Sequence, residues 1–248
     1  MKRFLTLFSA VFIISCSKTV NDTEDVCTSD CTTISGKFVT LNNAPVPGIS
    51  VSLSYHISGG ELGGGYTRKI VNTRAGADGI FSKSFYLKDN ELGDSARGYF
   101  IIDVDDRKID ANKYIRLDNN PLGFAIYSIG RRDTVINNIF YIPTKAFIKV
   151  HLNNFISQQA GDFFEVQSLF PYGPDIANNP FLDSPYSTGS SGYDTFKASQ
   201  PNNLFTVFVA EGEKNIIRIS KRKNGENSYQ DYPVFVPGNN TIELSYNY

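Results

Sequence analysis

Residues 45–53 read Pro-Val-Pro-Gly-Ile-Ser-Val-Ser-Leu, and this stretch decides the fold. Its Pro-Gly pair predicts a turn, because proline presets φ and glycine tolerates positive φ. Ile49, Val51 and Leu53 then alternate with serines, which places the apolar side chains on one face of a strand. The stretch therefore predicts a half-buried strand that begins at a tight turn.

The same pattern continues from residue 32 to the end of the chain as short alternating runs bounded by Gly, Pro, Asn and Asp. It predicts an all-β protein. The expected strands cover residues 35–41, 49–57, 66–72, 80–87, 98–104, 114–117, 124–129, 134–142, 146–152, 163–169, 193–198, 204–210, 215–221, 230–236 and 240–246. Pro143 should break the ladder, since proline has no N–H to donate. Asn224 and Gly225 predict a type I′ hairpin.

So many strands exceed one compact sandwich, and 248 residues allow one or two domains. We therefore expect two consecutive β-sandwich domains, 32–143 and 144–248. The assignment of the second as Ig-like rests on strand count alone.

Three elements of the first domain follow one another at characteristic spacing. They are Gly36-Lys37-Phe38-Val39, the stretch 45–53, and Thr73 with Ala77-Asp78-Gly79-Ile80-Phe81. Asp78-Gly79 predicts a tight hairpin that places Phe81 in the core. With these elements, residues 32–117 resemble the carboxypeptidase regulatory-like, transthyretin-like β-sandwich family, apart from a glycine-rich insertion at 58–65. The resemblance implies a rigid, non-catalytic module of the kind carried by exported proteases, outer-membrane receptors and lipoproteins.

The N-terminus predicts an export signal, with Lys2 and Arg3 before an apolar run too short to span a bilayer. Ile13-Ile14-Ser15 before Cys16 is similar to the bacterial lipobox. That resemblance implies a signal peptide at 1–15, acylation of Cys16, and a lipid anchor in the outer membrane, on its periplasmic face or at the cell surface. The alternative is an ordinary secretory signal with an incidental cysteine.

Residues 16–31 are polar and acidic and predict a tether. Its acidic run resembles the surface-export signal of Bacteroidota lipoproteins, although the carboxylates come late. Cys27 and Cys31 are candidates for a disulfide, which an exported protein permits, and whether they pair is left open. A zinc site would need further ligands, and His56 and His151 have no metal-like spacing, so no metal is expected.

No motif in the sequence names a reaction or a cofactor. The glycine-rich insertion lacks the Gly-Lys-Ser/Thr of a phosphate-binding loop. The aspartates between 103 and 110 lack the glycine and glutamate that a calcium loop needs, and no Gly-x-Ser-x-Gly order occurs. With 24 Lys+Arg against 25 Asp+Glu, the chain also lacks the basic excess of a nucleic-acid binder.

Residues 171–203 hold five of the eleven prolines but only one expected strand. Long loops of this kind are commonly functional or disordered, and the favoured interpretation is a covering loop whose aromatic rings close the end of the core. If the protein is instead a binding module, Tyr172, Tyr186 and Tyr193 are the candidates for contact with a partner, and Phe181 is expected to pack back on the domain.

The sequence thus favours a non-enzymatic outer-envelope lipoprotein that acts as a binding or structural module of an envelope complex. Its expected partners are the membrane, through the N-terminal lipid, and an envelope protein or glycan. The alternatives are a fimbrial or adhesin subunit and a sugar-binding accessory lipoprotein. The absence of tryptophan, the usual stacking platform for sugars, weakens the last of these.

Overall fold

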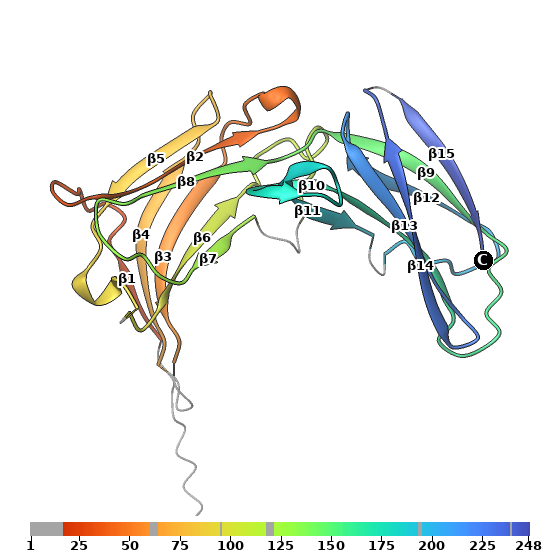
Figure 1. Ribbon diagram of the computed structural model, residues 1–248, viewed down its shortest axis with the longest axis horizontal. Helices are drawn as coiled ribbons and strands as arrows, with labels where there is room; N and C mark the ends of the chain where they lie inside the picture. The colour runs from red at the N-terminus through yellow and green to blue at the C-terminus, as the bar shows by residue number, and fades with distance from the viewer. Residues whose placement is uncertain (1–16, 60–63, 95, 118–121, 193–194, 239) are drawn as a thin grey trace, which may run out of the picture.

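The computed structural model describes residues 17–59, 64–94, 96–117, 122–192, 195–238 and 240–248, and they form an all-β protein, as predicted (Figure 1). The strands are β1 (Lys18–Asn21), β2 (Thr32–Val39), β3 (Ser50–Ile57), β4 (Tyr66–Arg74), β5 (Ile80–Phe85), β6 (Tyr99–Asp105), β7 (Phe124–Ile126), β8 (Val135–Tyr141), β9 (Lys145–Asn153), β10 (Phe163–Asn179), β11 (Ser184–Ser191), β12 (Asn203–Ala210), β13 (Lys214–Lys223), β14 (Glu226–Phe235) and β15 (Thr241–Asn247). Two short 3-10 helices, η1 (Leu41–Asn43) and η2 (Asp89–Glu91), lie between strands.

Within the described part of the chain, the strands form three sheets. A five-stranded sheet has the order β1-β4-β3-β6-β7, and a three-stranded sheet has the order β12-β9-β15. The third and longest sheet has the order β14-β13-β10-β8-β2-β5, with β11 beside β10. It runs through both halves of the arched molecule (Figure 1).

Each half has its own hydrophobic core. The first core includes Ile34, Val51 and Phe100, and the second includes Val150 and Ile217. The expected break at Pro143 separates β8 from β9. However, the first core also takes side chains from beyond that point, namely Phe170, Tyr172 and Ala210. The two halves therefore share elements of the chain.

Strand β10 is the main shared element. Its first part, through Leu169, pairs with β13, whereas Gly173 and Pro174 pair with β8. The expected irregular loop at 171–203 is therefore wrong for most of its length, because β10 continues to Asn179 and returns as β11. Register shifts in this hairpin accommodate prolines that cannot donate to a regular ladder.

Other turn and strand predictions had mixed outcomes. Asn224 and Gly225 both have positive φ and join β13 to β14, which confirms the two-residue hairpin. Asp78-Gly79 also forms a tight turn and Phe81 is buried, but β4 and β5 belong to different sheets, so the predicted hairpin is wrong.

Two expected strands are absent from the described residues. In 114–117, Tyr114 makes only an isolated bridge to Thr144. In the described part of 193–198, Lys197 makes only an isolated bridge to Glu165. Single bridges hold these segments against their neighbours without extending a ladder.

The expected tether also needs correction, because its first part belongs to the fold. β1 pairs in parallel with β4 along the edge of the five-stranded sheet. Asp22, directly after β1, accepts a hydrogen bond from Nε of Arg68 at 2.6 Å, and Nη1 of Arg68 donates to Glu91 at 2.6 Å. Arg68 is only 3% exposed, so it requires these carboxylates as partners. Residues 18–22 are therefore held in place rather than left free.

Asp22→Asn should weaken this attachment in a pH-dependent way. The hydrogen bond from Arg68 lowers the pKa of Asp22, so its stabilisation is present above the unfolded-state pKa and is lost as the pH falls through the folded-state pKa. We expect the variant to lose about 1.5–3 kcal/mol of unfolding free energy near neutral pH.

Urea unfolding at a series of pH values measures this effect. The difference in unfolding free energy between wild type and variant should decrease below about pH 4. Asp25→Asn, which changes an exposed carboxylate three residues away, is the matched control and should have little effect. If this difference in unfolding free energy stayed constant down to strongly acidic pH, the assigned role of Asp22 would be wrong.

Candidate functional site

A hollow lies on the face of the five-stranded sheet that points away from the first core. It has a volume of about 510 Å³, and its floor includes Ser50, Ser52 and Ser54 of β3. We call this hollow the serine groove. Its other polar lining residues are Asn21, Thr23, His56, Thr67, Lys69, Asn72, Asp103 and Asp105.

The alternation of the stretch 45–53 produces the groove. Val51 and Leu53 are buried in the first core, as the sequence predicts, so the serines between them must face the other side of the sheet. Their side chains are short, whereas those of β4 and β6 on either side are longer. The middle strand therefore forms the bottom of a trough.

His56 lies at one end of the groove and is held by two hydroxyl groups. Its Nε2 lies 2.9 Å from Oγ of Ser54 and its Nδ1 lies 3.1 Å from Oγ1 of Thr67. The ring of Tyr99 lies 6.1 Å from the imidazole, close to parallel with it. The imidazole is thus fixed between β3 and β4 beside an aromatic surface.

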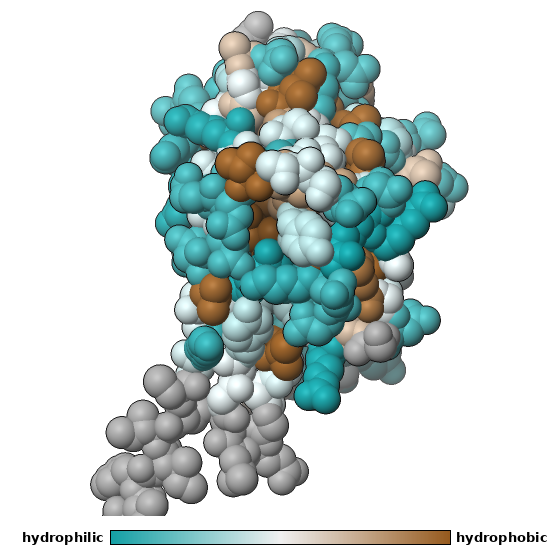
Figure 2. All heavy atoms as spheres, turned by 90° about the vertical axis from the view of Figure 1, so that its left-hand side faces the viewer, coloured by the Kyte–Doolittle hydropathy of each residue, from teal (hydrophilic) through white to brown (hydrophobic). Residues whose placement is uncertain are grey.

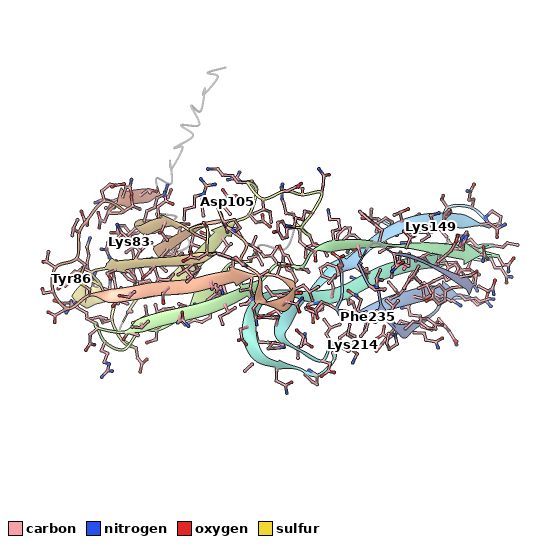
Figure 3. The ribbon with its side chains drawn as sticks, turned by 90° about the horizontal axis from the view of Figure 1, so that it is seen from above. Lys83, Tyr86, Asp105, Lys149, Lys214 and Phe235 are labelled. Atoms are coloured by element: carbon pink, nitrogen blue, oxygen red, sulfur yellow. A yellow bond between two sulfur atoms is a disulfide. The ribbon has the colours of Figure 1, made fainter. Side chains whose placement is uncertain are left out.

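Charged groups lie along both walls. Lys69 on β4 and Asp103 on β6 are exposed and take part in no ion pair within the described part of the chain. Asp105, at the end of β6 (Figure 3), is held by Arg107, whose guanidinium keeps the pKa of that carboxyl well below its usual range. The groove therefore offers both a cationic donor and anionic acceptors.

This arrangement suits binding better than bond cleavage. A serine nucleophile needs a histidine base that is oriented by a carboxylate, but the second nitrogen of His56 faces the hydroxyl of Thr67. Ser54 is also buried, which keeps its hydroxyl from a bulky substrate. In the described part of the chain, no group of three or more His, Cys, Asp or Glu side chains could hold a metal ion.

The burial of Tyr172 agrees with the covering-loop interpretation and excludes the contact role considered for this residue. This residue is 3% exposed and belongs to the first core, and its phenol donates to Oδ2 of Asp106 at 3.4 Å. Burial raises the pKa of the Tyr172 phenol. The side chain cannot contact a partner, because β10 turns it inward as a strand residue rather than presenting it on a loop.

The remaining residues of that segment lie in different surroundings. Tyr186 is half-buried and stacks on Tyr141, with ring centroids 4.6 Å apart. Tyr193 lies outside the described residues. Phe181 was expected to anchor the segment but is 40% exposed, and its neighbour Leu182 is the buried residue, at 1%. Tyr172 and Tyr186 therefore do not share an exposed contact surface.

The cysteines are divided between described and undescribed parts of the chain. Cys27 and Cys31 are joined by a disulfide, with Cα atoms 5.8 Å apart. The predicted acylation site, Cys16, and the predicted signal peptide at 1–15 lie outside the described residues. Neither short helix of the described chain is long and apolar enough to cross a membrane.

Seen from the end that carries the first core, the surface shows hydrophobic residues as separate patches among hydrophilic ones (Figure 2). Exposed apolar residues of this half include Ile80 and Val135. The hydrophobic residues seen from this end form no continuous apolar face.

Sequence reasoning did not identify the groove, although its signal was present. In the sequence, Ser50 and Ser52 indicate only the polar half of a strand pattern. A row of small side chains on one face predicts a trough only when the strand is known to lie between two others. The strand order supplies that knowledge, because β3 lies between β4 and β6.

No protein-family model matches this sequence, and neither does any curated protein. Among solved structures, the shaft pilin SpaA of Lactobacillus rhamnosus GG is similar over 88% of this chain and 97% of its own, at 7% identity and a TM-score of 0.29. A Bacteroides ovatus protein provisionally assigned to cell adhesion is similar over 88% of this chain and 91% of its own, at 11% identity and a TM-score of 0.28. The Bacillus anthracis TIE protein is similar at 12% identity and a TM-score of 0.30, and its match spans 88% of this chain but only 34% of the TIE chain. At these TM-scores and identities, the likenesses support no functional assignment.

The assignment of Tyr172 to the core can be tested by truncation. Tyr172→Ala should cost about 3–5 kcal/mol of unfolding free energy, because it leaves a cavity in the first core. Phe181→Ala, which removes a half-exposed ring from the same hairpin, is the control and should cost about 1 kcal/mol. Urea unfolding of both variants measures the difference. Equal losses would show that the burial of Tyr172 does not decide the stability of this region.

Proposed function

We propose that this protein is a non-enzymatic, lipid-anchored module of the bacterial cell envelope that binds a polar partner through the serine groove. The groove itself carries the proposal. It combines hydroxyl groups, a fixed imidazole, a lysine and two aspartates on a rigid sheet face. Groups held on strands lose little freedom when a ligand binds, which favours recognition.

The anchor in this proposal rests on the sequence before β1. The lipobox-like residues 13–15 precede Cys16, and an acylated cysteine there would attach the chain to a membrane. Several acyl chains give stable attachment, since each buried CH₂ contributes about 0.8 kcal/mol. The partner would then be another component of the same envelope, either a protein or a glycan.

One observation favours the sugar-binding alternative. Tyr99 lies beside His56 at the end of the groove, and its ring centroid is 5.9 Å from that of Tyr127. These rings offer a stacking surface in a chain that has no tryptophan. A glycan would combine stacking on the tyrosines with hydrogen bonds from the groove.

Another observation bears on the fimbrial or adhesin alternative. β1 lies at the edge of the five-stranded sheet, so its removal would expose the edge of β4. An exposed edge can pair with a strand of another copy. Size-exclusion chromatography after proteolytic removal of β1 distinguishes the fimbrial hypothesis from the binding-module hypothesis. A fimbrial subunit should polymerise, whereas a binding module should stay monomeric.

The anchor can be tested at Cys16. Mass spectrometry of the mature protein should find acylated Cys16 at the N-terminus. Cys16→Ser should release the protein from the membrane fraction, because the acceptor thiol is lost. An unmodified N-terminus at another residue would overturn the anchor.

Filling the groove tests the binding surface. Ser52→Phe should place a bulky ring on the groove floor, and we expect at least a tenfold loss of affinity for partners captured from solubilised envelopes or on a glycan array. Ser82→Phe makes the same change at an exposed serine of β5, on another sheet, and serves as the matched control. Equal binding by the two variants, with unchanged melting temperatures, would exclude the groove as the binding surface.

A further inference from the structure

The folded sheet begins very close to the proposed lipid attachment point. The backbone N–H of Lys18 donates to the carbonyl of Gly65 at 2.9 Å, so β1 is paired from its first residue. Only Ser17 separates Lys18 from Cys16. Because an extended chain spans at most about 3.6 Å per residue, the Cα atoms of Cys16 and Lys18 can be no more than about 7 Å apart.

β1 cannot easily lengthen this connection. Its four residues pair with β4, and the N–H of Asp22 donates to the carbonyl of Lys69 at 2.8 Å. The carboxylate of Asp22 is bound by buried Arg68 and also accepts from Nζ of Lys88 at 3.1 Å. An acyl group on Cys16 would therefore hold one end of the sheet at the bilayer surface.

The strand register identifies the residues at that end. Lys18 lies opposite Tyr66 on β4, and Tyr66 lies opposite Ile57 on β3. One residue earlier on β3, His56 lies opposite Tyr99 on β6. These residues form a row across the sheet at the level of the anchor.

The row continues onto the segment after β7. Phe100 lies opposite Ile126, which brings Tyr127 beside Tyr99. Tyr127 is 77% exposed, although it is a large aromatic residue. We call His56, Tyr99 and Tyr127 the aromatic rim, whereas Tyr66 packs against the first core on the other face of the sheet.

The chemistry of the rim suits the interface of a bilayer. Tyrosine has an apolar ring and a polar hydroxyl, and it is enriched where membrane proteins meet the headgroups. Among the described residues, Lys18 and Arg97 are exposed cations close to these strand ends, and Asp94 is an exposed anion. Cationic side chains at this depth favour lipid phosphate.

We propose that the aromatic rim rests on the membrane surface and fixes the orientation of the protein, so that the serine groove runs away from the bilayer. In this orientation Tyr99 and Tyr127 face the bilayer, so the partner is bound by the polar groups of the groove and not by stacking on these two rings. This inference rests on the lipid anchor of the proposed function. In the groove, His56 lies nearest the membrane, and Ser50 lies farthest along β3.

Tryptophan fluorescence tests the orientation, because the natural chain has no tryptophan. Tyr127→Trp places a single probe on the rim, and Phe235→Trp places one at an exposed position in the other half of the molecule (Figure 3). Each acylated full-length variant is reconstituted into phosphatidylcholine vesicles that contain lipid brominated near the headgroup. We expect severalfold quenching and a blue shift for Tyr127→Trp, and neither change for Phe235→Trp.

A third variant tests whether the short connection sets this orientation. A Gly/Ser linker of about 12 residues inserted between Ser17 and Lys18, with a root-mean-square span of about 20 Å, should reduce the quenching of Tyr127→Trp. If the acylated protein floats with the vesicles but the two probes are quenched equally, the orientation is wrong and the anchor stands. If Cys16 is not acylated and the protein does not float, the anchor itself is overturned, and the orientation with it.

Discussion

The continuity of β10 is the constraint on which the rest of the structure depends. One strand contributes to both halves of the longest sheet, with β13 as its neighbour at the start and β8 as its neighbour further on. Its side chains follow the same division, since Phe164 lies in the second core and Phe170 in the first. Because one continuous strand is hydrogen-bonded in both halves, the halves are not independent domains joined by a flexible linker. The arch of Figure 1 follows from this shared strand.

Local patterns predicted most of the strands because alternation and turn residues act over a few positions. The burial of Val51 and Phe81 and the Asn224-Gly225 turn depend on neighbours in sequence, and all three agree with the structure. The course of β10 depends instead on its partners β8 and β13, which are further away in sequence. Its prolines suggest a loop when read locally, and only the register shifts against β11 show how a ladder tolerates them. Sheet membership is equally non-local, which is why the turn at Asp78 connects two sheets although it has the residues of a hairpin.

The candidate site also depends on contacts that local sequence patterns do not predict. The sequence gives the serines of β3 and their common face, but the groove requires β4 and β6 on either side. The acidic segment before Cys27 illustrates the opposite case, in which composition suggested a tether. The carboxylate of Asp22 in this segment forms an ion pair with the buried side chain of Arg68. No local sequence pattern predicts this pairing. A charge that looks solvated in the sequence can therefore be a structural partner, when a distant strand places the opposite charge nearby.

The attachment of β1 links the membrane anchor to the binding surface. Asn21, the last residue of β1, and Thr23 both line the serine groove, and the carboxamide oxygen of Asn21 accepts hydrogen bonds from the backbone N–H and hydroxyl of Thr23. The groove is therefore complete only while β1 is paired with β4. Since the Asp22–Arg68 ion pair stabilises that pairing, the same interaction that holds the sheet close to Cys16 also holds one wall of the groove. A force that pulled β1 from the sheet would at once lengthen the connection to the membrane and remove two polar groups from the binding surface.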